Sequence, residues 1–289
     1  MASSRTQPAA AAEYEWFPAR LLQHVPLAPP DPLAVVILNQ PLDSPEILTR
    51  VFPKTKFKVA ADGGANQLYA IPKGSELGLH DIDVIIGDLD SVTPQVRSYF
   101  EEHTPAAEIV HDDDQYSTDF TKAVKYVRER YLGIDVVAIG GLGGRIDQGI
   151  SQLHHLYLFD EPRDIARGRY KVDWGQGDGS DPGGRTYLLS PDSIAFLLRP
   201  GHHRIHVREK RGNGEPGEEV FAKHVGILPM QGPSVISTAG LEWDITDWPT
   251  EFGGQMSTSN HVLPETEVVE VVTDRSVVFT IALNESWRN

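Results

Sequence analysis

The chain has 289 residues, of which 40% are hydrophobic and 23% charged, ordinary values for a globular protein with one large domain or two average ones. Its 41 acidic residues outnumber the 26 basic ones, and the formal charge of −15 argues against non-specific binding to nucleic acids or anionic membranes. The sequence contains no cysteine, which excludes disulfides, thiolate metal sites and a cysteine nucleophile.

Residues 1–30 are expected to form a flexible N-terminal tail. The opening stretch MASSRTQPAAAAEYEW has no long apolar core and Glu13 interrupts it, so it is not typical of a secretory signal. Its Ser- and Ala-rich composition is weakly similar to that of a transit peptide, but a disordered tail is the better interpretation. The longest apolar run, LAVVIL, is far too short to span a membrane. We therefore expect a soluble, cytoplasmic protein.

Residues 31–165 have the pattern of an α/β domain. Short β-branched segments bounded by turn residues predict buried strands at LAVVILNQ, KFKVAADGGA, DIDVIIGDLDS and IDVVAIGGLGG. Apolar residues recur every three or four positions from Phe120 to Tyr131, which predicts an amphipathic helix with Ser117 or Thr118 as its N-cap. A second helix is expected at DQGISQLHHLYLF. Strands that alternate with helices predict a mostly parallel, covered sheet.

The second half of the chain has a different pattern. Residues 166–185 are rich in Gly and Asp and predict a loop or linker, whereas residues 186–289 contain only short strand-like runs, typical of a sandwich or barrel. The expected fold is α/β, with a parallel-sheet N-terminal domain and a C-terminal all-β sandwich domain. The long loops at 168–185 and 209–219 receive no functional role.

Charged side chains gather directly after the predicted strands and at the start of the first predicted helix. They are Asp62, Asp88, Asp90, Asp119, Lys122, Arg145 and Asp147. Ligands of open parallel sheets bind outside the carboxyl ends of the strands, and the free N–H groups of a helix start favour an anion. Taken singly, each residue is explained as a turn, a cap or a solvated loop residue.

Together these carboxylates predict a cation site. Two carboxylates about 4 Å apart repel by about 4 kcal/mol at an effective dielectric constant of about 20, so several of them converge only at a cost that a divalent cation relieves. Oxygen ligands suit Mg²⁺, which also binds substrate phosphates, and Lys122 and Arg145 could neutralise a transferred phosphoryl group. The sequence has no Gly-Lys dipeptide for a P-loop and no His-Glu pair for a zinc protease. The residues predict a Mg²⁺-dependent enzyme acting on a phosphorylated small molecule, with the substrate left open.

The motifs ADGGAN, IIGDLDS, DQYSTDFTKA and GGLGGRIDQ, in this order, resemble the blocks of the thiamine pyrophosphokinase family. STAGLEWDI and FGGQMSTSN continue the resemblance in the second half. The resemblance implies an enzyme that uses ATP and Mg²⁺ to transfer a pyrophosphoryl group to the hydroxyethyl oxygen of thiamine, with AMP leaving. It also implies an α/β domain plus a β-sandwich domain, in a homodimer whose two subunits share each active site.

The resemblance assigns roles to individual residues. Asp88, Asp90 and Asp119 resemble the carboxylates that hold Mg²⁺ and the triphosphate. The other catalytic residues that it implies are Lys122 and Arg145 as phosphate ligands and Asp147 in the acidic cluster. On the nucleotide side it implies Asp62, Gly63, Gly64, Asn66, Thr118 and Gln148. For the thiamine pocket it implies Trp243, Ser257 and Asn260, and a tryptophan face suits a cationic thiazolium ring.

Two departures from the family pattern are visible. Leu89 stands where phenylalanine is common, and Tyr116 stands where an acidic residue is frequent, so Tyr116 is left out of the metal site. Two alternatives also stay open. A Mg²⁺-dependent phosphohydrolase or nucleotidyl-transferring enzyme with another acceptor would share the aspartates without needing Trp243. A non-catalytic nucleotide or thiamine sensor would not need paired carboxylates. No general base is assigned from the sequence.

Overall fold

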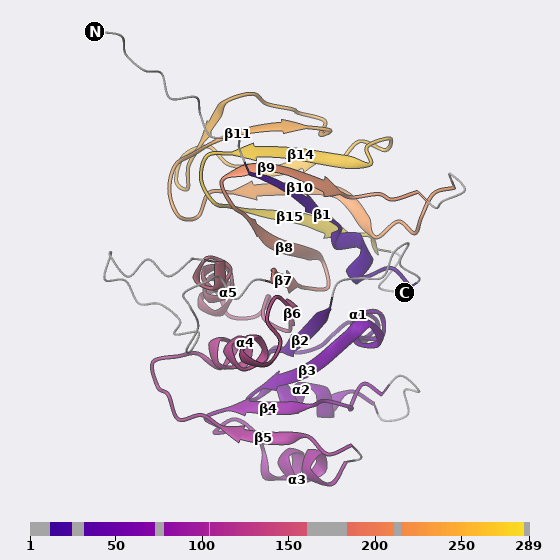
Figure 1. The fold of residues 1–289 in the computed structure, drawn as a ribbon, viewed down its shortest axis with the longest axis vertical. Helices are drawn as coiled ribbons and strands as arrows, with labels where there is room; N and C mark the ends of the chain where they lie inside the picture. Colours follow the sequence, from indigo (N-terminus) through magenta and orange to yellow (C-terminus); the bar gives the residue numbers. More distant parts are fainter. Residues whose placement is uncertain are drawn as a thin grey trace. The chain divides into compact units, whose positions relative to one another are not determined.

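The computed structural model describes residues 12–24, 32–72, 78–103, 105–160, 184–210 and 215–285 (Figure 1). The chain divides into two compact units. One unit comprises Arg20–Phe196 and the C-terminal residues from Leu283, and the other comprises Met1–Ala19 and Leu197–Ala282. In the described part of the chain, no helix is both long enough and apolar enough to cross a membrane.

The first unit is built on a sheet of parallel strands. In spatial order they are β7 (Thr186–Leu189), β6 (Asp135–Ile139), β2 (Leu33–Ile37), β3 (Thr55–Ala61), β4 (Val84–Gly87) and β5 (Glu108–His111). All five residues of β2 are buried, as expected for a central strand with both faces covered. The mixed α/β class is confirmed, and each of the four strands predicted between residues 31 and 165 is present.

Helices connect these strands. They are α1 (Pro45–Val51), α2 (Gly64–Ala70), α3 (Pro94–Glu102), α4 (Asp119–Arg130) and α5 (Ile146–Asp160), with 3₁₀ turns at Pro18–Leu21 and Phe52–Lys54. Helix α4 is the predicted amphipathic helix, and its N-cap is Thr118, whose hydroxyl accepts a hydrogen bond from the Thr121 amide. The buried side chain of Arg128 near its C-terminus donates to the carbonyl oxygens of Phe159 and Gly184. These bonds connect the end of α4 to the end of α5 and to the residues just before β7.

The second unit is made of β-strands. A five-stranded sheet has the order β1 (Glu13–Trp16), β9 (Gly201–His206), β14 (Val268–Thr273), β11 (Ser234–Ala239) and β12 (Trp248–Thr250). The remaining strands are β10 (Phe221–Leu228), β13 (Ser257–His261) and β15 (Val277–Leu283). Buried and more exposed residues alternate along β9 and β14, as expected for a sheet with one covered face.

The expected boundary at residues 166–185 differs from the observed one. β7 pairs in parallel with β6, and β8 (Ser193–Leu198) pairs antiparallel with β7, so the change of unit falls inside β8. β7 therefore belongs to the first unit, although residues 186–289 were expected to form the second. A run such as TYLL does not reveal which sheet it joins, because its four residues are all buried. Residues 166–183 of the predicted linker lie outside the described residues.

The prediction of a flexible tail is wrong for Glu13–Trp16. This segment forms β1 and pairs in parallel with β9, in the register Glu13↔His202 to Trp16↔Ile205. Trp16 is 5% exposed, and its indole Nε1 donates to Nδ1 of His203 at 3.0 Å. The pairing explains the difference, because a short polar strand gains its stability from a partner almost 190 residues away. Residues 1–11 and 25–31 lie outside the described residues.

Replacing Trp16 by alanine is expected to lower the free energy of unfolding by about 3 kcal/mol, the usual cost of removing a buried tryptophan side chain. Urea denaturation of the full chain measures this. Glu13→Ala, at the exposed start of the same strand, is the control and should change stability by no more than about 0.5 kcal/mol. A Trp16→Ala variant that unfolds at the wild-type urea concentration would show that β1 contributes nothing to stability.

Candidate active site

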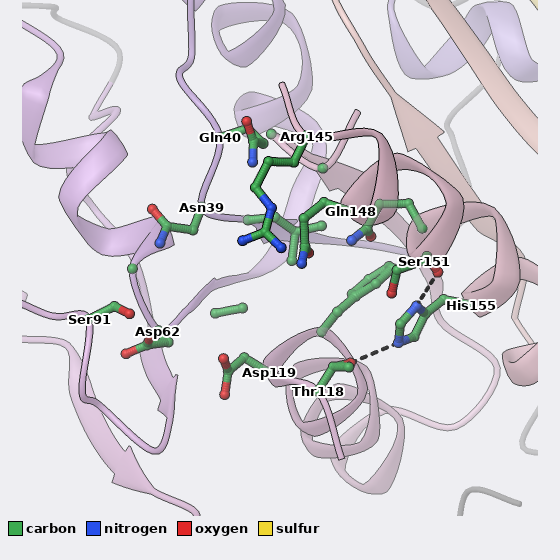
Figure 2. Close-up of a pocket in the computed structure, with 17 residues that line it drawn as sticks. Asn39, Gln40, Asp62, Ser91, Thr118, Asp119, Arg145, Gln148, Ser151 and His155 are labelled. Carbon is green, nitrogen blue, oxygen red and sulfur yellow. Dashed lines mark hydrogen bonds between the residues drawn. The ribbon is translucent and has the colours of Figure 1, made fainter. Parts of the chain in front are cut away.

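A cavity of about 310 Å³ opens at the carboxyl ends of the parallel strands in the first unit (Figure 2). Its walls come from the segments after β2, β3, β4 and β6, from the start of α4 and from the first three turns of α5. Most of the residues that line it are polar or glycine, and they include Asp62, Asp119 and Arg145. The position is the one expected for ligands of an open parallel sheet.

Three carboxylates converge beside this cavity. One oxygen each from Asp62, Asp88 and Asp90 lies within 4.8 Å of the others. Asp62 is 4% exposed, and its Oδ1 has no hydrogen-bond partner among the residues that the structure describes, whereas Asp88 is half-buried and Asp90 is exposed. A buried carboxylate oxygen without a partner is costly. A hard divalent cation bound by these three groups would remove that cost, and their oxygens are the ligands that Mg²⁺ prefers.

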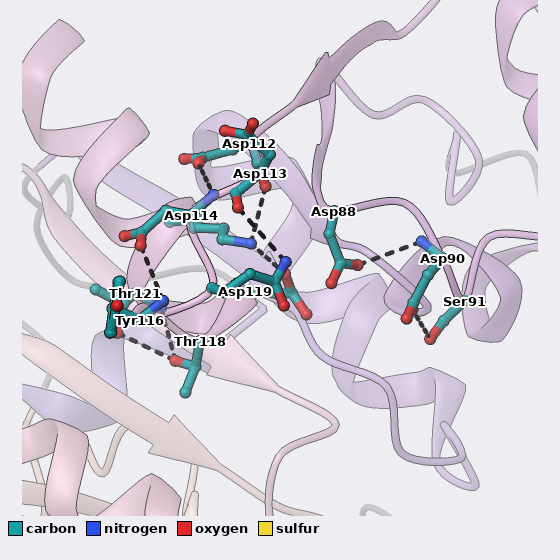
Figure 3. A network of polar contacts seen from close by, with 12 residues as sticks. Asp88, Asp90, Ser91, Asp112, Asp113, Asp114, Tyr116, Thr118, Asp119 and Thr121 are labelled. Carbon is teal, nitrogen blue, oxygen red and sulfur yellow. Dashed lines mark hydrogen bonds and ion pairs between the residues drawn. The ribbon is translucent and has the colours of Figure 1, made fainter.

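Unusual backbone conformations hold this group in place. Asp62 has φ +43° and Leu89 has φ +61°, both in the left-handed region that a leucine rarely adopts. Leu89 stands between Asp88 and Asp90, and the amide of Asp90 donates to Oδ1 of Asp88 at 3.3 Å (Figure 3). Strain of this kind costs about 1–2 kcal/mol per residue and is frequent at functional sites.

Gly87, the last residue of β4, lets a fourth carboxylate approach. A Cβ atom at this position would lie 2.8 Å from Cβ of Asp62 and 2.9 Å from Oδ1 of Asp119. Both distances are shorter than normal van der Waals contacts, so any larger residue would push the two aspartates away. The glycine of the GDLD motif therefore leaves room for both Asp62 and Asp119 beside the strand end.

Asp119 is the first residue of α4 and is half-buried. Burial raises the pKa of its carboxyl group, the charge of Lys122 opposes this shift, and the charges of Asp62 and Asp88 raise the pKa further. Nζ of Lys122 lies 3.4 Å from Oδ1 of Asp119 and donates to the Asp112 carbonyl oxygen at 2.9 Å. One buried lysine thus offsets only part of the negative charge, and a bound cation would offset the rest.

Arg145 and Asp147 pair with each other at the start of α5. Both side chains are exposed, and the hydrogen bond from Arg145 lowers the pKa of Asp147. Arg145 and Gln148 line the cavity, whereas Asp147 is not part of the group formed by Asp62, Asp88 and Asp90. The expected place of Asp147 in the acidic cluster therefore differs from the observed one, because the arginine two residues away captures it.

The start of α2, directly after β3, contacts the segment that follows Asp88 and Asp90. The side-chain amide of Asn66 donates to the Ser91 carbonyl oxygen at 2.7 Å, and its oxygen accepts from the Thr93 amide at 3.2 Å. A Cβ atom on Gly64 would lie 2.2 Å from the carbonyl oxygen of Ile37, so this glycine allows α2 to pack against β2. Gly63 lines the cavity. Asn66 and Gly64 thus have structural partners that account for them without a nucleotide.

Several cavity residues were missed in the sequence. Asp62 is not one of them: it was counted among the charged residues after the strands and was assigned to the nucleotide side by the resemblance, and it is the buried member of the carboxylate group. The missed residues with uncharged polar side chains are Asn39, Gln40, Ser91, Ser151, Gln152 and His155. Two signals could have revealed them. Asn39 and Gln40 directly follow a predicted strand, and residues 148, 151, 152 and 155 share one face of a helix by their spacing.

The residues expected to bind thiamine lie in the second unit. Trp243 is 55% exposed, and its ring centroid lies 5.1 Å from that of His261. The side chain of Asn260 is buried, accepts from the backbone amide of Trp243 at 3.1 Å and donates to its carbonyl oxygen at 2.8 Å. Asn260 therefore fixes the turn that presents Trp243. Ser257, at the start of β13, is half-buried.

Comparison with known proteins places both halves of the chain. The profile of the thiamin pyrophosphokinase catalytic domain matches residues 48–165, and that of the thiamin pyrophosphokinase vitamin B1 binding domain matches residues 202–278. The chain is 32% identical over 266 residues to Thiamine pyrophosphokinase 3 of Oryza sativa subsp. japonica, with 86% of each chain covered. The chain belongs to the thiamine pyrophosphokinase family.

Other family members agree with this assignment. Thiamine pyrophosphokinase 1 of Arabidopsis thaliana is 31% identical over 269 residues, with 88% of this chain and 87% of that protein covered. The crystal structure of yeast thiamin pyrophosphokinase superposes with a TM-score of 0.75 at 21% identity and covers 94% of this chain and 92% of its own. At that identity the superposition shows a shared fold. The family predicted from the sequence motifs is thereby confirmed, and the catalytic-domain match contains all four aspartates of the cavity region.

Proposed function

We propose that this protein transfers the pyrophosphoryl group of ATP to thiamine and releases thiamine diphosphate and AMP. The observation that carries the proposal is the group formed by Asp62, Asp88 and Asp90 beside a polar cavity, in the part of the chain that matches the family's catalytic domain. A tight cluster of carboxylates is suited to a metal–triphosphate and unsuited to a bare anion.

Magnesium fits these residues. A divalent cation would give the unpartnered Oδ1 of Asp62 a ligand and would favour the charged form of Asp119, whose pKa is raised. Asp62, Asp88 and Asp90 would hold this cation, with Asp119 close by. When bound, Mg²⁺ would neutralise charge on the triphosphate.

The other residues of the site bind and position the substrates. Lys122 is held by the Asp112 carbonyl oxygen and offers a fixed positive charge, and Arg145 adds a guanidinium group to the cavity wall. The hydroxyethyl oxygen of thiamine forms a bond to the β-phosphorus of ATP and loses its proton. The bond from that phosphorus to the oxygen bridging the α- and β-phosphates breaks, and AMP leaves with this oxygen. Because such transition states are loose, alignment and charge neutralisation supply most of the rate enhancement.

For thiamine we propose a binding surface that includes the exposed ring of Trp243, with Ser257 nearby on β13. A tryptophan face attracts a cationic ring, and Asn260 keeps the turn that carries Trp243 in place. The family resemblance further suggests a homodimer in which each active site uses the catalytic unit of one subunit and the β unit of the other. Full activity in a demonstrably monomeric preparation would contradict the homodimer.

Replacing Trp243 by alanine is expected to weaken thiamine binding by about thirtyfold, because a desolvated cation–aromatic contact is worth about 2 kcal/mol. ATP binding should change little. Isothermal titration with each ligand measures both affinities. Phe252→Ala is the matched control, since Phe252 is an equally exposed aromatic residue of the same unit, and it should leave thiamine affinity unchanged. Unchanged thiamine binding in a folded Trp243→Ala variant would contradict the assignment.

One assay separates the candidate functions. The protein is incubated with ATP, Mg²⁺ and thiamine, and the products are resolved by chromatography. Equal amounts of AMP and thiamine diphosphate support the proposal. Nucleotide hydrolysis at the same rate without thiamine would instead support a phosphohydrolase, and ligand binding without any turnover would support a sensor.

A further inference from the structure

His155 is a buried, titratable residue that the proposed reaction does not use. It lies on α5, is 2% exposed and contributes to the cavity wall (Figure 2). Its Nδ1 lies 2.5 Å from the Ser151 carbonyl oxygen, and its Nε2 lies 2.7 Å from Oγ1 of Thr118. A carbonyl oxygen can only accept, so Nδ1 carries the proton. Nε2 is therefore the acceptor, and the Thr118 hydroxyl donates to it.

The Thr118 hydroxyl also caps α4, the helix that carries Lys122. Oγ1 of Thr118 accepts from the Thr121 amide at 3.2 Å, and α4 begins at the next residue, Asp119. Because the Thr118 hydroxyl donates its hydrogen bond to His155, a lone pair of Oγ1 points at the Thr121 amide. Without His155 the hydroxyl could rotate and donate to Oγ1 of Thr121, which lies 3.1 Å away. The bond from α5 thus selects one arrangement of the first turn of α4.

The surroundings of His155 keep it neutral. The rings of Phe120 and Phe159 lie 5.1 Å and 5.3 Å from its ring, and His154 is 5.7 Å away. Burial lowers the pKa of His155 to about 4, the Ser151 carbonyl oxygen opposes this shift, and His154 adds to it. At neutral pH the ring therefore has one acceptor and one donor nitrogen, and both are occupied.

We propose that His155 is a positioning residue: its Nε2 orients the Thr118 hydroxyl, which fixes the first turn of α4 and so places Asp119 and Lys122 for the triphosphate. The inference rests on the proposed function, since those two side chains are assigned to the metal–triphosphate site. It differs from the role that a histidine in a cavity wall would ordinarily suggest, which is proton transfer during the reaction.

Paired substitutions test the bond. His155→Phe keeps the ring and removes the acceptor, whereas His155→Gln can place an amide oxygen near the position of Nε2. Thr118→Val removes the hydroxyl at nearly constant volume, and Thr118→Ser keeps it. His155→Phe and Thr118→Val are each expected to lower kcat/KM for ATP by about tenfold, the usual weight of one well-formed hydrogen bond. The Gln and Ser variants should stay within about threefold of wild type.

The double variant decides whether His155 acts through Thr118. If it does, His155→Phe combined with Thr118→Val is no slower than the slower single variant. Two losses that multiply to about a hundredfold would overturn the inference, because independent roles add in free energy. Wild-type kcat/KM in His155→Phe would overturn it as well.

Two further readouts separate positioning from proton transfer and from general loss of structure. In metal-free, nucleotide-free protein, His155→Phe should speed amide exchange at Thr121 and Lys122 by about fivefold, the value of a lost N-cap, with no change at Val124 and Val127. The acid limb of the pH–rate profile should be the same in wild type and His155→Gln. Its disappearance in His155→Gln would overturn the inference in favour of a general base. Absence of AMP formation in wild type would refute the proposed function, and the exchange measurement would still confirm or overturn the role of His155.

Discussion

Replacing Asp62 by asparagine is expected to lower AMP formation from ATP and thiamine by at least about a hundredfold, because the site loses a ligand charge that stabilises the transition state. In metal-free buffer the same variant should be at least as stable as wild type. The substitution removes a buried negative charge with an unpartnered oxygen, and it relieves the repulsion that helps to raise the pKa of Asp119. Asparagine tolerates φ +43° about as well as aspartate, so the backbone contributes little to either result.

Urea denaturation in the presence of EDTA measures stability, and AMP release at saturating Mg²⁺ measures turnover. Asp247→Asn is the matched control, because Asp247 has a similar left-handed backbone at φ +47° but is exposed and lies in the other unit. It should change neither quantity appreciably. If Asp62 were only a turn residue, the Asp62→Asn variant would lose about 1 kcal/mol of stability and would turn over at the normal rate. These two results together would contradict the metal-site assignment.

Replacing Lys122 by methionine should have an effect of the opposite sign on stability. The variant removes the cation beside half-buried Asp119 and the donor to the Asp112 carbonyl oxygen, and it should lower the free energy of unfolding by about 3 kcal/mol. Turnover should fall by at least about a hundredfold, because the positive charge proposed to offset that of the triphosphate is lost.

Lys125→Met, one turn further along α4, controls for the loss of a lysine from this helix. Lys125 is half-buried and should contribute no more than about 0.5 kcal/mol. The two experiments also check each other, since removing a charge from Asp62 stabilises the apoprotein and removing one from Lys122 destabilises it. A Lys122→Met variant with wild-type stability and turnover would show that the ion pair has no role at the site.

Local patterns predicted much of the site. The motif that ends β4 places Asp88 and Asp90 where the strand stops. The spacing of apolar residues predicted α4 with Ser117 or Thr118 as its N-cap, and the structure selects Thr118. Each of these two predictions depends only on residues that are close together in the sequence. The membership of Asp62 in the carboxylate group could not be predicted in this way, because it depends on the pairing of β3 with β4 and on the space left by Gly87. Such contacts have no periodicity in the sequence.

The errors have the same origin. Trp16 looked like part of a tail because its partner, His203, is 187 residues away. β7 was assigned to the wrong half because four buried residues carry no information about the strand beside them. Asp147 is the exception, as its capture by Arg145 is a contact between near neighbours that the sequence did allow one to consider.

The position of β1 has a consequence for shortened forms of this protein. β1 is the outermost strand of its sheet, and β9 is the next one in. A chain that begins after Trp16 would leave the backbone N–H and C=O groups of β9 unpaired along one side, with Arg204 and His206 no longer facing Glu15. An uncovered strand edge recruits other strands, including the same edge of a second molecule. Shortened variants that begin at the apparent start of the α/β unit would therefore be prone to self-association through β9, even with every cavity residue present.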